Sequence, residues 1–193
     1  MDAGTLALTG NGRLTQGGAL SGASGSSVDW SGMTGFPWQR IGALSGDGTL
    51  VMGGRYLEVN SNTDSTFAGT IQSGDALSKG GAGTLQLNGS GSFLVSNVAA
   101  GTLLVGGSAA SAAARLAGDV TVATGAMLGG HGSIGGDVTV NSGAHLSPGG
   151  TGVGNSMGTL KVEGDLTLTT GAQLDFDFGA PGASLSVPGL CNG

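Results

Sequence analysis

The chain has 193 residues, of which 43 are glycine, 9% are charged and only 4% are aromatic. Its 12 acidic and 6 basic residues give a net charge of −6. The bases are scattered singly, which argues against a nucleic-acid partner because phosphate backbones are bound by clustered Lys and Arg. A single cysteine, Cys191, excludes a disulfide framework, and no apolar run is long enough to span a bilayer as a helix.

Short strands are predicted from the beginning of the chain. A motif that reads Gly-Thr-Leu-x-apolar-x-Gly, or nearly so, begins at Gly4, Gly48, Gly83, Gly101 and Gly158. Apolar residues alternate with other residues in this motif, which is the period-two pattern of a strand with one buried face. The flanking glycines are typical of turns, so the motif predicts strands that are each ended by a tight corner.

Residues 30–38 depart from this glycine and threonine style. Trp30, Phe36 and Trp38 place three of the eight aromatic residues of the chain within nine positions. One interpretation is that these rings fill the core or cover the edge of the apolar interior. The other is that they are exposed and stack on a sugar or a protein partner. The core interpretation is preferred, and the three residues are kept as candidate ligand contacts.

An eleven-residue unit occurs three times in the second half of the chain, as GDVTVATGAML at 118–128, GDVTVNSGAHL at 136–146 and GDLTLTTGAQL at 164–174. Each unit predicts two short strands separated by a turn, with the threonines Thr121, Thr139 and Thr167 facing outward. The apolar positions of the units predict a repeated core, which consists of Val120, Val122, Leu128, Val138, Val140, Leu146, Leu166, Leu168 and Leu174.

One such unit cannot bury its own apolar residues, whereas stacked units can. The sequence therefore predicts an all-β protein, a right-handed single-stranded parallel β-helix (solenoid) over residues 1–178, followed by an irregular tail at 179–193. Roughly 20 residues per rung would give nine or ten rungs. The first two units, which begin at Gly118 and Gly136, should be neighbouring rungs. The longer offset to the third unit should accommodate a loop around residues 149–155. Residues 108–116 are expected to form a short turn or a bulged corner.

Residues 66–107 read TFAGTIQSGDALSKGGAGTLQLNGSGSFLVSNVAAGTLLVGG. This string resembles the passenger-associated repeat of bacterial autotransporters, the proteins of type V secretion. The matching positions are Lys79, Gly81, Gly83, Thr84, Leu85, Leu87, Gly89, Ala100, Gly101, Thr102, Leu103 and Val105. Residues 128–177 resemble the segment that follows in that family, with Pro148, Gly149 and Gly150 and then Gly158, Thr159 and Leu160 at the expected places. The resemblance covers about residues 41–178.

The resemblance implies a virulence-associated protein that is secreted and displayed at the cell surface, with the full-length form associated with the outer membrane. An outer-membrane β-barrel translocator is expected in the full-length protein and is not present in these residues, so the chain is expected to be a fragment or a truncated product. The first residues lack the basic and apolar regions of a signal peptide, which places any export signal upstream.

Candidate chemical groups are few, and we expect no catalytic, metal-binding or cofactor-binding residues. Asp119, Asp137 and Asp165 are equivalent members of the repeat and are expected to cap backbone groups at a turn. His131 and His145 occupy variable positions and are expected to be exposed. Asp175 and Asp177 alternate with phenylalanines and are expected to face water. A calcium-binding nonapeptide is not supported, because Ile134 stands where the ligand aspartate is required.

The leading hypothesis is a non-catalytic structural module, a surface-display stem of an autotransporter passenger that belongs to an adhesin with a host-surface or glycan ligand. The alternative is a β-helical polysaccharide-binding or polysaccharide-degrading protein, with Trp30 and Trp38 as its platform. The edge after residues 166–178 should expose Leu174, Phe176 and Phe178, which predicts end-to-end self-association.

Overall fold

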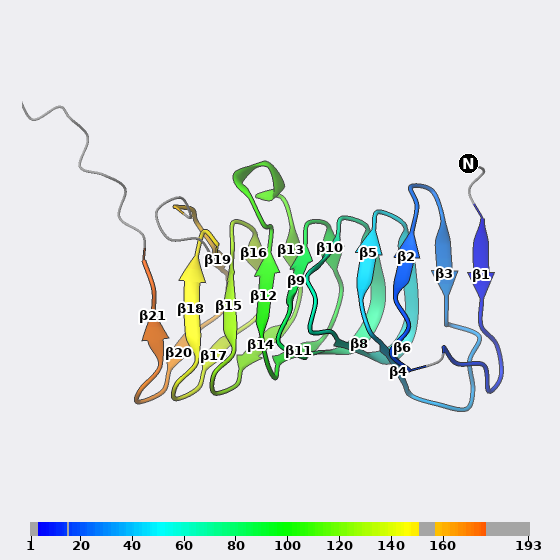
Figure 1. The fold of residues 1–193 in the computed structure, drawn as a ribbon, viewed down its shortest axis with the longest axis horizontal. Coiled ribbons are helices and arrows are strands. Elements are labelled where there is room, and N and C mark those ends of the chain that lie inside the picture. Colours follow the sequence, from blue (N-terminus) through cyan, green and yellow to red (C-terminus); the bar gives the residue numbers. More distant parts are fainter. Residues whose placement is uncertain (1–3, 15, 151–156, 177–193) are drawn as a thin grey trace, which may run out of the picture.

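The structure is a computed structural model that describes residues 4–14, 16–150 and 157–176. It is all-β, with parallel strands stacked as a solenoid of about seven turns, as the sequence predicts. Figure 1 shows the strands side by side along the long axis, from β1 at the N-terminal end to β21 at the other. Asp177, Phe178 and the irregular tail predicted at 179–193 lie outside the described residues.

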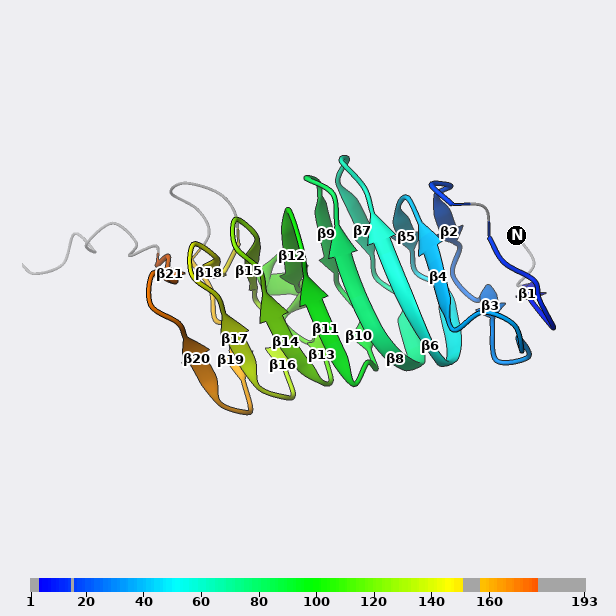
Figure 2. The same ribbon diagram turned by 90° about the horizontal axis from the view of Figure 1, so that it is seen from below.

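The strands form three faces, and the chain passes from the first to the second to the third on each turn. The first face comprises β1 (Thr5–Ala7), β3 (Ser27–Asp29), the beginning of β6 (Thr49–Asn60), the beginning of β8 (Thr70–Gly80), β10 (Ser90–Gly91), β13 (Arg115–Leu116), β16 (Ser133–Ile134) and β19 (Lys161–Val162). The second face comprises β4 (Trp38–Ile41), the ends of β6 and β8, β11 (Val95–Val98), β14 (Asp119–Val122), β17 (Val138–Val140) and β20 (Leu166–Leu168). Figure 2 looks onto this second face.

The third face is a separate sheet of eight strands, β2 (Leu20–Gly22), β5 (Leu44–Gly46), β7 (Ser65–Phe67), β9 (Thr84–Leu87), β12 (Thr102–Val105), β15 (Met127–Gly130), β18 (His145–Pro148) and β21 (Gln173–Leu174). The first two faces belong to one sheet because β6 and β8 are long enough to turn the corner between them. In β8 the turn lies at Ser73, which has a φ of 53° in the left-handed region that few residues other than glycine adopt. The preceding strand β6 turns at Gly53 and Gly54.

The register confirms the predicted stacking of the eleven-residue units. Leu128 pairs with Leu146 on the next rung, and Leu146 pairs in turn with Leu174 across the longer offset. Successive register partners on the third face lead from Leu20 to Leu174 in about seven turns, rather than the nine or ten expected. Most of the difference arises because the expected number counted all 193 residues, whereas these turns span residues 20–174. The rest arises because two of the turns carry insertions at the corner between the third and first faces.

One of these insertions contains the 3₁₀ helix η1 (Ala109–Ser111), within the segment that was expected to form a turn or a bulged corner. The other insertion joins β18 to β19, and residues 151–156 of its predicted loop lie outside the described residues. Both insertions leave the pairing of the strands on either side unchanged. Chain length is therefore varied at this corner without any effect on the stack.

The interior is built from columns of buried side chains, in which each residue is the register partner of a residue on the next rung. Six of the nine predicted core residues are buried, with at most 2% of their surface exposed: Val120, Val122, Leu128, Val138, Val140 and Leu146. Leu166, Leu168 and Leu174 are instead 44%, 43% and 37% exposed, so the core prediction is wrong for these three. They continue the same columns, but no described rung covers them. The exposure of Leu174, and of Phe176 at 56%, agrees with the exposed edge that was predicted for this end. The outward threonines Thr121 and Thr167 are exposed, and Thr139 is half-buried.

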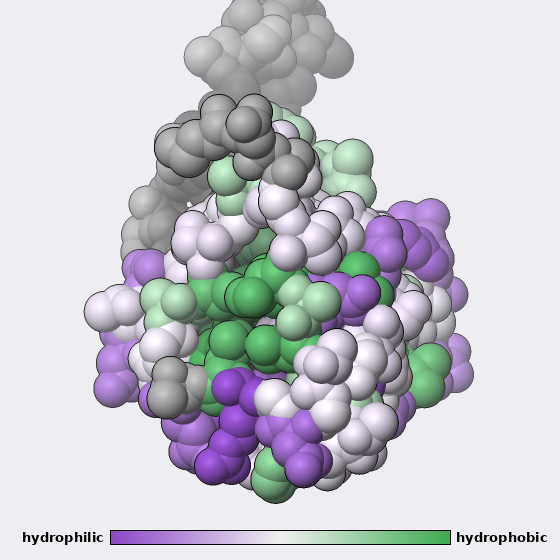
Figure 3. Space-filling view, turned by 90° about the vertical axis from the view of Figure 1, so that its right-hand side faces the viewer, coloured by the Kyte–Doolittle hydropathy of each residue, from purple (hydrophilic) through white to green (hydrophobic). Residues whose placement is uncertain are grey.

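The apolar interior is also exposed at the N-terminal end. Figure 3 looks along the solenoid onto this end, where hydrophobic residues at the centre are surrounded by hydrophilic ones. The partly buried residues Leu8, Leu14, Leu20 and Val28 pack against the core, and Leu6 on β1 is 50% exposed. The apolar columns therefore run from the first described rung to the last.

Candidate functional site

The repeated aspartates bind the backbone of the next rung, as the sequence predicts. Asp119 Oδ1 accepts a hydrogen bond of 2.9 Å from the backbone N–H of Asp137, and Asp137 Oδ1 accepts one of 2.8 Å from that of Asp165. The same contact explains the glycines before Asp137 and Asp165, because a Cβ at Gly136 would lie 2.2 Å from Asp119 Oδ1 and one at Gly164 would lie 2.3 Å from Asp137 Oδ1. The Gly-Asp pair of the repeat is therefore a device that joins adjacent rungs.

Other corners use the same device with other residues. Asn62 and Asp64 accept hydrogen bonds of 3.0 and 2.7 Å from the backbone N–H groups of Ala82 and Thr84 on the next rung, and Asn88 accepts one of 2.9 Å from Gly107. Sequence reasoning missed these residues because they are not part of a recurring unit. The signal that could have found them is a single Asn or Asp at a corner about one rung before a glycine-rich turn.

Lys79 is buried, although it carries the only amine in the interior of the described residues. Only 1% of its surface is exposed, and Nζ donates to the backbone carbonyls of Gly80, Gly81 and Ala100 at 2.8, 2.9 and 3.2 Å. Burial lowers the pKa of the Lys79 amine below its ordinary value, and the negative charge of Asp64 opposes this shift. The lysine of the family-like repeat thus ties together two consecutive corners.

Trp30, one of the three candidate contact residues, lies in the core. It is 0% exposed, and its indole N–H has no hydrogen-bond partner among the described residues. Trp30 therefore cannot serve as a ligand platform, and this part of the polysaccharide-binding alternative is wrong. Phe36 and Trp38 are 38% and 37% exposed, so they remain available to a ligand.

The structure places a second exposed aromatic residue beside Trp38. Trp38 on β4 is the register partner of Tyr56 on β6, which is 46% exposed. Neighbouring strands lie about 4.8 Å apart, so the two rings occupy adjacent positions in one outward column of the second face. Ala76 and then Val95 continue this column. Tyr56 was missed because it is an isolated tyrosine whose proximity to Trp38 depends on the register.

A polar column runs beside the aromatic one. It consists of Arg40, Glu58 and Ser78, which are also register partners on the same three strands. Arg40 Nε lies 2.7 Å from Glu58 Oε2, and the Arg40 guanidinium lies 5.8 Å from the centre of the Trp38 ring. Between the two columns lies an open groove of about 260 Å³, lined by Trp38, Tyr56, Leu57, Glu58, Ala76 and Ser78.

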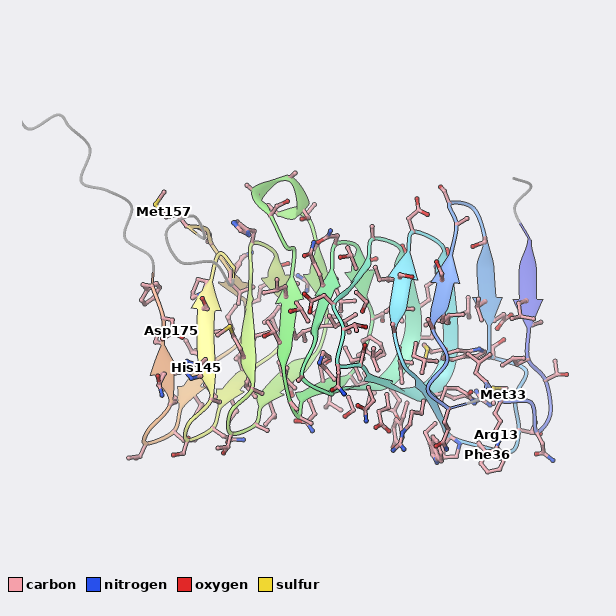
Figure 4. The ribbon with its side chains drawn as sticks, in the orientation of Figure 1. Arg13, Met33, Phe36, His145, Met157 and Asp175 are labelled. Atoms are coloured by element: carbon pink, nitrogen blue, oxygen red, sulfur yellow. The ribbon has the colours of Figure 1, made fainter. Side chains whose placement is uncertain are left out.

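Phe36 lies near this groove in sequence and has its own cationic neighbour. The Arg13 guanidinium lies 5.1 Å from the centre of the Phe36 ring, and Figure 4 shows the two side chains together near the N-terminal end. Arg55 is held elsewhere, since it donates to the carbonyls of Gly53 and Met33. Arg40 and Arg55 thus lie on the rungs that carry the exposed rings, and Arg13 lies on the rung before them.

A second groove lies on the first face and has a different character. Its volume is about 440 Å³, and it is lined mainly by hydroxyl and amide groups: Thr70, Ile71, Gln72, Ser73, Ser90, Gly91, Ser92, Arg115 and Ala117. Arg115 at its edge pairs with Glu163 at 2.8 Å. This groove presents no aromatic ring.

The two histidines are less exposed than predicted. His131 is half-buried, and Nε2 lies 3.3 Å from the Met157 carbonyl oxygen. His145 Nδ1 lies 2.8 Å from Asp175 Oδ2, and Figure 4 shows the two side chains close together on the last rungs. Within residues 4–14, 16–150 and 157–176, no three His, Cys, Asp or Glu side chains come together as metal ligands would. In the same ranges, no helix is long and apolar enough to cross a membrane.

Compared with family models, curated proteins and solved structures, the chain matches none of them at a significant level. The resemblance of residues 41–178 to autotransporter passengers therefore remains an expectation from sequence.

Proposed function

We propose that this chain is a non-catalytic structural module, a rigid stem within a secreted passenger that is displayed at the surface of a bacterium. The observation that carries the proposal is the continuity of the interior. Apolar columns run through about seven turns, and each ladder between rungs is parallel. At about 4.8 Å per turn, seven turns span on the order of 35 Å.

The way in which the rungs are joined supports a role as a stem. Strand ladders, the cross-rung bonds of Asp119 and Asp137, and the bond from Lys79 to Ala100 all connect one rung to the next. Each rung of a solenoid depends on its neighbours, so a chain of this kind can fold by adding one rung to the last. This property suits a protein that folds progressively as it emerges from a membrane. The resemblance to autotransporter passengers supports the same role.

The test is surface display of the whole 193-residue chain. The chain is placed between an N-terminal epitope and a β-barrel translocator in a Gram-negative bacterium. We expect the epitope to be accessible to antibody on intact cells and the stem to resist external protease. Val138→Asp places a charge in a core column and should make the stem sensitive to protease. The matched change Thr139→Asn on the outward side of the same strand should leave it resistant.

Two results would overturn the proposal. One is an epitope that stays inaccessible although the purified chain is folded. The other is a stem that is degraded as readily with the native sequence as with Val138→Asp.

A further inference from the structure

We infer that the groove between Trp38, Tyr56 and the Arg40–Glu58 pair is a binding site for a neutral saccharide chain that lies along the solenoid axis. The inference is independent of the role as a stem. It starts from the exposed aromatic rings of Trp38 and Tyr56 on the second face, which the stacking of rungs does not require. At the equivalent outward positions of later rungs stand Val95 and Asp119.

The two columns of the groove match the two kinds of surface that a sugar presents. The C–H groups on one face of a pyranose ring are apolar and pack on aromatic side chains, whereas its hydroxyls need hydrogen-bond partners at the rim. Trp38 and Tyr56 supply the aromatic surface and are 37% and 46% exposed. Glu58 and Ser78 line the same groove beside them, and they can accept or donate hydrogen bonds.

The charges favour a neutral ligand. Arg40 and Glu58 neutralise each other at 2.7 Å, so the groove attracts neither an anion nor a cation strongly. An acidic saccharide would approach the Glu58 carboxylate, and a cationic one would approach the Arg40 guanidinium. A paired carboxylate and guanidinium can still bind adjacent hydroxyls, the first as an acceptor and the second as a donor.

The direction of the groove follows from the register. Trp38, Tyr56 and Ala76 lie on three successive rungs, as do Arg40, Glu58 and Ser78. Both columns therefore run along the axis, and a ligand that contacts both rings must cross from rung to rung. Ala76 is small and leaves the groove open toward the middle of the solenoid. The second-face backbone of β6 is paired on both sides, and so is that of β8, whereas β4 is paired only with β6. An added peptide strand would therefore extend the sheet beyond β4 and would not lie in the groove.

The test is titration calorimetry on the purified chain with neutral oligosaccharides (cellohexaose, xylohexaose and chitohexaose), with a galacturonate hexamer as the acidic probe. A glycan array extends the set. We expect saturable binding of at least one neutral saccharide. Trp38→Ala and Tyr56→Ala should each weaken that binding at least tenfold, because each removes a stacking surface. Tyr56→Phe keeps the ring and should stay within about threefold of the native affinity.

A matched control comes from the same outward column. Val95 is 50% exposed and lies outside the groove, so Val95→Ala should leave the affinity unchanged. Each variant is accepted only if its unfolding midpoint agrees with that of the native chain. The inference is overturned if no neutral saccharide binds, if only the acidic probe binds, or if binding survives the combined loss of both rings. Capture of an apolar peptide in place of a sugar would overturn it as well.

Discussion

Residues 36–60 and residues 118–148 occupy equivalent parts of the solenoid, one near its N-terminal end and one toward the other end. Their inward side chains follow the same rule: Leu57 and Val59 are as buried as Val138 and Val140. Their outward side chains differ. The later rungs present threonines and cross-rung aspartates, whereas the earlier rungs present Trp38 and its charged and aromatic neighbours.

The difference separates the demands of folding from those of binding. In a parallel stack, outward residues of adjacent rungs contact each other, so threonine ladders are well tolerated and every outward residue of the repeat is explained by stacking. The exposed pair of Trp38 and Tyr56 gains at most about 1 kcal/mol from contact between the strands, and it still leaves apolar surface in water. A ligand is therefore to be sought where the outward residues differ from those of the repeat, even though the inward residues follow the same rule in both regions.

The largest effect should come from the interior, and it tests whether the two regions share one rule. Leu57→Ala in the earlier rungs and Leu128→Ala in the later ones remove side chains that are 1% and 0% exposed. Each should lower the free energy of unfolding by about 2–5 kcal/mol through lost burial and a cavity. Urea denaturation followed by circular dichroism measures both. A cost below about 1 kcal/mol at Leu57 alone would break the comparison, because it would mean that the earlier rungs are packed loosely.

A smaller effect is expected at Lys79, which lies between the two regions. Lys79→Met keeps the aliphatic part of the side chain but leaves the carbonyls of Gly80, Gly81 and Ala100 without their donor. We expect a loss of about 1–3 kcal/mol, the cost of unsatisfied buried polar groups, in the same urea experiment. No loss would show that water replaces the amine at this corner.

The pH dependence of this variant provides a second measurement. The pKa of Lys79 is lower in the folded chain than its ordinary value of 10.5, so between the two values the unfolded chain holds a proton that the folded chain has released. The stability of the native chain relative to Lys79→Met should therefore rise as pH rises toward 10.5 and be level below the folded pKa. A relative stability that falls over that window would contradict burial as the cause.

Much of the fold could be predicted from sequence because the repeat units carry alternation and glycine corners together. The first face could not be predicted. Its later strands β10, β13, β16 and β19 are two residues long, so each has a single inward residue and no alternation to recognise. The Gly-Thr-Leu motif was equally ambiguous, since it begins strands of the first face at Gly48 and of the third face at Gly83. The eleven-residue unit predicts only two strands, and these belong to the second and third faces.

The candidate site was half predicted. Trp38 was identified by its type, but whether a tryptophan points inward or outward depends on one step of register, and Trp30 points into the core. Tyr56, Arg40 and Glu58 carried no signal of their own, because their proximity to Trp38 follows from a pairing of β4 with β6 that no repeated motif marks in this part of the chain. The groove could not be predicted because it forms only when the strands pair in this register, and the sequence does not show which residues pair.

The smallest effect is expected at the surface, where one Arg–Glu pair lies within residues 36–60 and another, Arg115 with Glu163, flanks residues 118–148 in the sequence. In the later rungs, hydrogen bonds from Arg115 and then Lys161 hold the pKa of the Glu163 carboxyl below its ordinary value of 4.5. A carboxyl with a lowered folded pKa adds stability that is fully present above 4.5 and is lost as pH falls through the folded pKa. Glu163→Gln should therefore lower the thermal midpoint slightly at pH 7, and the difference from the native chain should vanish in acid. Because the pair is exposed, the difference at pH 7 should also shrink as salt is raised.

Glu58→Gln, in the groove of the earlier rungs, is the matched variant and should weaken saccharide binding, which Glu163→Gln should not. A Glu163→Gln deficit that persists in acid, or that is unchanged by salt, would mean that the side chain acts through packing and not through its charge.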